Sequence, residues 1–264
     1  MDLAGTLDLL WGDRPGPRRG PKPALTHDRI ARAGIAIADA EGLAAVSMQR
    51  VAADLGFTKM SLYRYVPGKA ELVALMADLA IGAPPADVTA PLSTHAAPDG
   101  TAPPTADDRC DRLRGWALAL LPGFLRHPWV LEATTGPRVV GPHELAWMEA
   151  ALALLDGTGL GGAERMDVLA VLAGHVRNIA QQVATKPGGD TGTRFAEILT
   201  EVVRERGDRY PAIKAALADA TDAARGGARD GALGYGLDLI LDGLRARVRS
   251  RAPGAARDGD STQS

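Results

Sequence analysis

Residues 46–66 read VSMQRVAADLGFTKMSLYRYV and contain two helix starts eleven residues apart. Ser47 and Thr58 are residues of the type that caps helix N-termini, and each follows an apolar residue able to pack further along its helix. Gly56 between them suits the positive φ at which many helices end. The spacing leaves room for one two-turn helix and a tight corner, so this stretch predicts a helix-turn-helix.

The second of these helices is predicted to carry a mixed polar and apolar outer face. At about 100° per residue, Leu62 and Val66 face inward while Met60 and Arg64 point outward. A charge, hydroxyls, a phenol and an apolar contact together suit the phosphates and base edges of DNA. The alternative is a surface helix whose polar face is only solvated. An exposed Met-Tyr-Arg surface is costly without a partner, which favours DNA binding.

Net positive charge is concentrated in the N-terminal part of the sequence. The whole chain has 30 basic and 32 acidic residues, a net charge of −2, which excludes a globally basic nucleic-acid binder. Between Arg14 and Lys69, ten Lys/Arg stand against four Asp/Glu, a net charge of +6. One end of the molecule is therefore suited to phosphate contact. Residues 18–23, RRGPKP, read as an extended arm that either reaches a neighbouring groove or is a solvated tail.

Composition indicates a soluble, cytoplasmic, helical protein. The 264 residues include a single cysteine, Cys110, which can form no internal disulfide and fits a reducing compartment. No run approaches eighteen apolar residues, and the first residues lack the pattern of a signal peptide. Aromatic residues are only 4%, and helix formers dominate. The expected fold class is all-α, with an N-terminal three-helix helix-turn-helix domain and a helical body.

The expected domain boundaries follow the composition. Residues 1–24 are predicted to be a flexible basic arm, 25–70 the helix-turn-helix domain, and 71–264 a regulatory and dimerisation domain. Within the last, 83–106 holds six prolines and is predicted to be a flexible connector, and 250–264 a disordered tail. Periodicity predicts body helices at roughly 107–126, 141–156, 162–185, 192–206 and 228–249.

Two further helices are expected around the corner motif. Thr26 is predicted to cap a first helix that ends near Gly42. Pro67 is predicted to open a helix whose apolar stripe includes Leu72 and Leu79. That stripe is too long to serve only the small helix-turn-helix domain (the head). This helix is therefore expected to join the head to the regulatory domain (the body) and to act as a lever between them.

Two body helices are candidates for self-association. The segment 166–183 is apolar almost all round, and Leu237 to Val248 carry one clean stripe. Paired with their copies from a second subunit they would form a four-helix interface. The alternative is that both pack within one monomer.

The stretch from Met48 to Leu79, with SLYRYVPGKAEL at 61–72, is similar to the DNA-binding head of TetR-family transcriptional repressors. Further on, RHPW at 126–129, Gly141-Pro142 and GLDLILDGL at 236–244 resemble the C-terminal domain of the tetracycline-repressor type. The resemblance implies an all-helical homodimer that binds a palindromic operator in double-stranded DNA and releases it when a small-molecule inducer enters the body. The predicted connector is longer than is usual in the family.

The resemblance also implies roles for residues of the head. Those expected to hold phosphates are Ser47, Thr58, Tyr63 and Lys69. Those expected to face or approach bases are Gln49, Arg50, Lys59, Met60, Ser61 and Tyr65. Arg64 stands at a position where an aromatic residue would be expected. It could contact either a guanine base or a phosphate, and the sequence does not decide between them.

Candidate ligand contacts in the body are fewer. They are the polar and aromatic residues Trp116, His143, Trp147, His175, Asn178 and Gln182. The last three recur on one face of an apolar helix, either as ligand anchors or as a hydrogen-bonded seam of the dimer. For the tryptophans and His143, ordinary packing is the alternative. No His/Asp pair has metal-binding spacing, so no metal or cofactor is expected and tetracycline itself is not implied.

Two rival functions remain to be weighed. Gly157, Gly159 and Gly162 have the spacing of a dinucleotide-binding loop, but they lie between helices rather than after a strand, so an enzyme is not expected. A dimeric transcription factor without an inducer would have the same head. Inducer identity, operator sequence and the choice between repression and activation cannot be read from the sequence.

Overall fold

The computed structural model describes residues 3–12, 25–90, 104–184, 191–225 and 231–251. These residues are helical, with short turns and no strand among them, so the expected all-α class is confirmed. The α-helices are α1 (Leu3–Trp11), α2 (His27–Glu41), α3 (Met48–Asp54), α4 (Lys59–Tyr63), α5 (Lys69–Ile81), α6 (Ala86–Thr89), α7 (Ala106–Arg126), α8 (Trp129–Ala133), α9 (Pro142–Leu154), α10 (Gly162–Ala184), α11 (Thr191–Arg206), α12 (Pro211–Arg225) and α13 (Gly231–Arg251).

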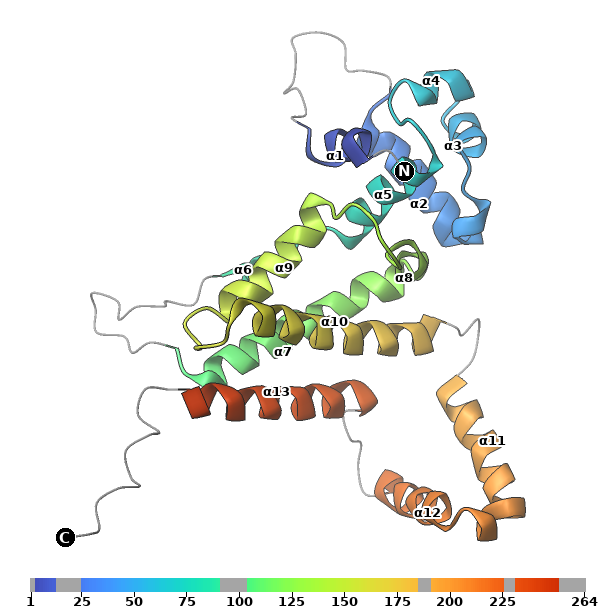
Figure 1. Ribbon diagram of the computed structural model, residues 1–264. Helices are drawn as coiled ribbons and strands as arrows, with labels where there is room; N and C mark the ends of the chain where they lie inside the picture. The colour runs from blue at the N-terminus through green and yellow to red at the C-terminus, as the bar shows by residue number, and fades with distance from the viewer. Residues whose placement is uncertain (1–2, 13–24, 91–103, 185–190, 226–230, 252–264) are drawn as a thin grey trace, which may run out of the picture.

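Helices α1 to α5 form the head, which lies above the body in Figure 1. Helix α2 packs along α5, with Ile30 and Leu72 fully buried in the shared core. The α2 backbone lies against the Met76 side chain at Gly34, where an added Cβ would lie 2.5 Å from the Sδ atom of Met76. A larger residue there would have to displace the Met76 side chain, so glycine permits this close packing of α2 on α5.

The body is a stack of long helices crossing one another (Figure 1). Helix α10 packs on both α7 and α13, and α9 covers α7 and α10 on the side of the head. Leu113, Leu172 and Leu241, one from each long helix, are almost completely shielded from solvent. They belong to one hydrophobic cluster that continues from the body into the head.

Helix α10 does not bury its whole circumference in the single chain. Val171 is 52% exposed and Val183 is 41% exposed, and on α13 Tyr235 and Leu239 are more exposed still. The sequence predicted burial of α10 on both faces, whereas one chain covers only one of them. The open face is contiguous with a groove of about 380 Å³ between α10 and α13.

Several predicted boundaries differ from the structure. Residues 3–11, assigned to a flexible arm, form helix α1, whose Leu9 and Leu10 are buried against the head. Helix α6 interrupts the predicted connector, and α12 was not anticipated. Most of the basic arm, residues 13–24, lies outside the described residues, as do 91–103 of the connector and 252–264 of the tail.

Other expectations hold. Thr26 caps α2 and Gly42 ends it at a φ of +85°. The lever helix begins at Lys69, two residues after Pro67, with Gly68 as its N-cap. None of the helices that the structure describes is long and apolar enough to cross a membrane.

Candidate DNA-binding surface and ligand cavity

The corner between α3 and α4 is fixed by local hydrogen bonds. Ser47 Oγ accepts from the backbone N–H of Arg50 at 3.2 Å, and Thr58 Oγ1 accepts from that of Ser61 at 3.2 Å. Each bond satisfies an N–H of a first helical turn, which has no partner within the helix. Gly56 has a φ of +74°, a conformation that favours glycine. The two helix starts expected from the sequence are thus present at the expected residues.

Helix α4 turns its buried side to the core and its other side outward. Leu62 is fully buried, whereas Met60 is 73% exposed and Tyr63 and Arg64 are exposed beside it. Among the eleven residues expected to contact DNA, ten are exposed and Ser61 is half-buried. The short helix α4 therefore presents a cationic, aromatic and thioether surface to solvent.

Some of these side chains are already engaged with one another. Lys59 Nζ lies 5.6 Å from the centre of the Tyr63 ring, a cation–π contact that orients both. The hydroxyls of Thr58 and Ser61 are 2.9 Å apart. Tyr65 accepts a hydrogen bond from His27 Nε2 through its backbone carbonyl at 3.0 Å, so its position is set by α2. Preordering of this kind lowers the entropy that a contact with DNA would cost.

Arg50 forms a bidentate ion pair with Glu41 at the end of α2. One of its two bonds, Nη1 to Oε2, is 2.7 Å long. The hydrogen bond from Arg50 lowers the pKa of the Glu41 carboxyl. Arg50 must exchange this carboxylate for another anion before it can contact DNA.

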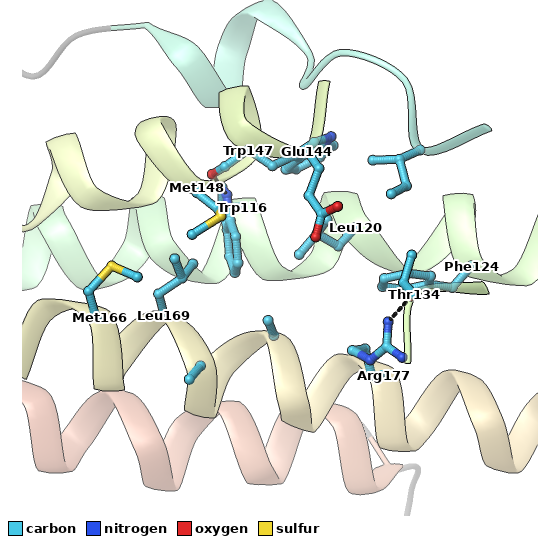
Figure 2. Close-up of a pocket in the computed structure, with 13 residues that line it drawn as sticks. Trp116, Leu120, Phe124, Thr134, Glu144, Trp147, Met148, Met166, Leu169 and Arg177 are labelled. Atoms are coloured by element: carbon cyan, nitrogen blue, oxygen red, sulfur yellow. Dashed lines mark hydrogen bonds between the residues drawn. The ribbon is translucent and has the colours of Figure 1, made fainter. Parts of the chain in front are cut away.

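A cavity of about 250 Å³ lies in the body between α5, α7, α9 and α10 (Figure 2). Its walls are aromatic, aliphatic and thioether side chains, and polar groups enter it at only a few points. Figure 2 shows Met166 and Leu169 at one end and Phe124, Thr134 and Arg177 at the other. The lining residues are Ile81, Trp116, Leu120, Phe124, Thr134, Glu144, Trp147, Met148, Met166, Leu169, Ala170, Ala173 and Arg177.

Two of the six predicted ligand residues reach this cavity. Trp116 and Trp147 line it, with their rings edge-on at 6.2 Å. Trp116 Nε1 donates to the carbonyl of Trp147, and Trp147 Nε1 donates to that of Gly82, each at 2.9 Å. With both indole N–H groups bonded to the protein, the tryptophans offer apolar ring surface to a ligand.

The other four predicted residues lie elsewhere. His143 contacts Asp78 of α5, and His175 Nε2 lies 3.1 Å from the carbonyl of Leu233, against α13 of the same chain. Asn178 and Gln182 are exposed on α10 and do not line the cavity. The predicted polar stripe therefore runs along the side of α10 that faces away from the cavity.

Sequence reasoning missed the polar residues that do line the cavity, Thr134, Glu144 and Arg177. Arg177 donates from Nη1 to Thr134 Oγ1 at 2.7 Å and from Nη2 to the Leu131 carbonyl at 2.9 Å. Glu144 is paired through both carboxylate oxygens with Arg138. A basic residue in the middle of an otherwise apolar helix was the one available signal for Arg177.

Two aspartates of the head bind the body. Asp39 of α2 accepts hydrogen bonds from His127 Nδ1 at 2.8 Å and Trp129 Nε1 at 2.7 Å. Asp78 Oδ1, on α5, accepts from the backbone N–H groups of His143 at 2.9 Å and Glu144 at 3.2 Å. Asp78 thereby caps helix α9 from another helix, next to the cavity.

Asp78 is held in a buried setting by close backbone approach. Burial raises the pKa of its carboxyl, although the two backbone N–H groups and His143 act in the opposite direction. An added Cβ on Gly141 would lie 2.2 Å from Asp78 Oδ1. Glu144 lines the cavity, and its backbone N–H donates to Asp78 of the lever helix α5. This hydrogen bond therefore connects the cavity wall to α5.

An exposed cationic helix-turn-helix joined by a lever helix to a cavity-bearing helical body defines a transcriptional regulator of the two-domain type. Comparison with known proteins agrees. Residues 30–76 match the family model for bacterial regulatory proteins of the tetR family, and residues 102–248 match that for the tetracyclin repressor-like C-terminal domain. The chain belongs to the TetR family.

Relatives of the chain are regulators as well. It is 38% identical to the HTH-type transcriptional repressor DrrR1 of Streptomyces coeruleorubidus over 265 residues, covering 95% of this chain and 88% of that protein. It is 28% identical to an HTH-type transcriptional regulator of Saccharopolyspora erythraea, covering 79% and 81%.

The fold is shared with solved structures. Apo ActR from Streptomyces coelicolor superposes with a TM-score of 0.66 at 24% identity, over 88% of this chain and all 100% of ActR. ActR in complex with actinorhodin gives a TM-score of 0.65 at 24% identity, covering 88% and 99%.

Proposed function

We propose that this chain is a cytoplasmic repressor that binds a palindromic operator as a homodimer and releases it when a small molecule enters the body. The observation that carries the proposal is the position of the lever helix α5. Its first residue, Lys69, follows the exposed α4 surface, and its last residue, Ile81, lines the cavity. A ligand can shift an equilibrium only by contacts that differ between two states, and α5 takes part in both.

Dimer formation is supported by the open apolar face of α10 and α13. Members of this family usually bind DNA as dimers. The exposed side chains Val171, Val183, Tyr235 and Leu239 form the kind of surface that a second copy covers in a symmetric helical interface. Two copies would supply the twofold-related pair of α4 helices that half-sites of an operator require.

Ligand-controlled release is supported by the cavity and by a relative. The ActR protein, which shares this fold, has been crystallised with actinorhodin. A transcription factor without an inducer remains the second candidate, because it would have the same head; the cavity favours the ligand-responsive one.

The test uses DNA fragments from upstream of the gene, with fluorescence anisotropy at fixed salt concentration. We expect Arg64→Ala and Tyr63→Phe each to weaken binding by about tenfold, because both side chains lie on the exposed face of α4. Arg165→Ala, on a body helix, is the matched control and should leave binding unchanged. Unaltered affinity in both head variants, or a monomer in sedimentation at low ionic strength, would contradict the proposal.

A further inference from the structure

The cavity carries an excess of positive charge at one end. Arg177 donates its two hydrogen bonds to uncharged oxygens, those of Thr134 and the Leu131 carbonyl. In the described part of the chain it forms no ion pair. Its guanidinium also lies 5.6 Å from the Phe124 ring centre, so one of its sides is apolar. A half-buried cation without a carboxylate partner is an uncommon and costly arrangement.

The neighbouring charges do not neutralise Arg177. Glu144 is the acid that interacts electrostatically with Arg177. Both of its carboxylate oxygens, however, accept hydrogen bonds from Arg138. Burial lowers the pKa of Arg177, and the positive charge of Arg138 lowers it further. With two arginines and one glutamate, the group has a net charge of +1. Arg138 Nε is in addition a buried donor that has no partner among the described residues.

The rest of the cavity is shaped for flat apolar rings. Trp116, Trp147 and Phe124 contribute aromatic surface, and the sulfurs of Met148 and Met166 make favourable contacts with ring edges. An apolar cavity of roughly 150 Å³ holds one benzene ring. A volume of about 250 Å³ therefore has room for two fused rings and a small acidic group.

We propose that this cavity binds an aromatic acid, whose rings lie between Trp116, Met148 and Leu169 and whose anionic group binds Arg177. This inference rests on the proposed function and names the class of its ligand. A carboxylate or phenolate there would form a charge-assisted bond with a guanidinium that has no ion-pair partner among the described residues. Arg177 also holds the Leu131 carbonyl of α8, and α8 holds Asp39 of the head through Trp129, so the anion would act on a residue already connected to α2.

Three probes of one shape test the charge. Calorimetric titration of the full-length protein at about pH 7.5, where a carboxylate is ionised and an amine is protonated, uses 2-naphthoate, 2-naphthamide and 2-naphthylmethylamine. We expect 2-naphthoate to bind at least about tenfold more tightly than the other two. Equal or tighter binding of the amide or amine, or no binding of any probe, would overturn the assignment.

Variants locate the anion. Arg177→Met should weaken 2-naphthoate by about tenfold and leave 2-naphthamide within about threefold, whereas a merely structural role would weaken both alike. Arg165→Met on the same helix, whose guanidinium pairs with Asp156, is the matched control and should change neither. If Arg177→Met does not fold, the probe series on the unaltered protein still decides the question.

Operator binding is measured in parallel, so that the two proposals fail separately. If the amine or amide binds most tightly and releases DNA, the proposal of ligand-controlled release stands and the proposal of an acidic ligand fails. If 2-naphthoate binds through Arg177 but does not release DNA, the acid-binding site stands. The proposal that a ligand in this cavity releases the operator is then contradicted.

Discussion

Trp129 donates an indole hydrogen bond of 2.7 Å to Asp39 Oδ1, which joins helix α8 of the body to helix α2 of the head. His127 reaches the same oxygen at 2.8 Å, so a single carboxylate holds two body residues. Asp78 on α5 and Trp11 on α1, whose Nε1 donates to the Val140 carbonyl at 3.0 Å, add further attachment points between head and body. The angle between head and body is thereby set by a small number of polar contacts.

The Asp39–Trp129 bond should be measurable by a double-mutant cycle. We expect Asp39→Ala and Trp129→Phe to show a coupling of about 1–2 kcal/mol in the free energy of unfolding by urea, since the bond is partly buried and its acceptor is charged. Asp28→Ala on the same helix, which removes an exposed pair with Arg32, should cost less than about 1 kcal/mol. Additive effects of the first two changes would contradict an energetic role for the junction.

Glu41 holds Arg50, one of the residues expected to contact DNA, in an ion pair. Glu41→Gln should tighten operator binding by about two- to fivefold, because it frees the guanidinium and removes a negative charge near the phosphates. Asp28→Asn changes the same charge on the same helix away from Arg50 and separates the two causes. Equal gains from both variants would assign the effect to net charge alone, contrary to our expectation.

Gly141 permits the close approach of Asp78 to the start of α9. Gly141→Ala should lower the free energy of unfolding by about 1–3 kcal/mol, since its Cβ would lie 2.2 Å from Asp78 Oδ1. It should also reduce the response of operator binding to ligand. Gly115→Ala on α7, whose Cβ would meet nothing within 4 Å, is the control and should be neutral or slightly stabilising. Full response in Gly141→Ala would exclude this contact from the coupling.

Glu164 ties the start of α10 to the end of α13 through Arg251. The hydrogen bond from Arg251, helped by the N–H of Gly161, lowers the pKa of Glu164 to about 2 from the usual 4.5. A lowered carboxyl pKa stabilises the fold above pH 4.5, and that stabilisation is lost as the pH falls toward 2. The difference in urea midpoint between the unaltered protein and Glu164→Gln should therefore shrink over this range.

Both side chains of the Glu164–Arg251 pair are 37% exposed and so in contact with solvent, and salt offers a second check. At about 1 M salt the same difference should be reduced, because exposed charges are then screened beyond roughly 3 Å. A difference that stays constant with both pH and salt would assign the effect of Glu164→Gln to something other than its charge.

Helix α1 can be tested as a structural part of the head. Leu10→Ala should cost about 2–3 kcal/mol, since Leu10 is buried on the side of α1 that packs on α5. Leu3→Ala, on the exposed side of the same helix, should cost less than about 0.5 kcal/mol. If both variants lower the free energy of unfolding by the same small amount, the prediction that residues 3–11 belong to a flexible arm would be correct after all.

Local signals made the head predictable. The caps Ser47 and Thr58 and the positive φ of Gly56 depend on neighbours within a few residues, so a sequence pattern contains them in full. The exposed face of α4 then follows from helical periodicity alone. Helix α1 was missed because nine apolar-rich residues acquire a fixed place only through their packing on α5, which is distant in sequence.

The cavity depends on contacts that no local pattern holds. Arg177 meets Thr134 and Leu131, which are 43 and 46 positions away, and Asp78 meets Glu144 across 66. His175, Asn178 and Gln182 do share one face of α10, but periodicity cannot tell which neighbour that face meets. In the structure the face of His175 meets α13 instead of the cavity.

The packing of Gly34 against Met76 has a geometric consequence for the proposed dimer. A helix of 13 residues such as α5 is about 20 Å long, so a tilt of roughly 10° about its cavity end displaces the far end by about 3 Å. Because α2 packs along α5, the head would travel with it, and in the proposed dimer twofold symmetry would double the change between the two copies. Against the roughly 34 Å repeat of a DNA turn, that displacement would put both α4 helices of the proposed dimer out of step with the grooves.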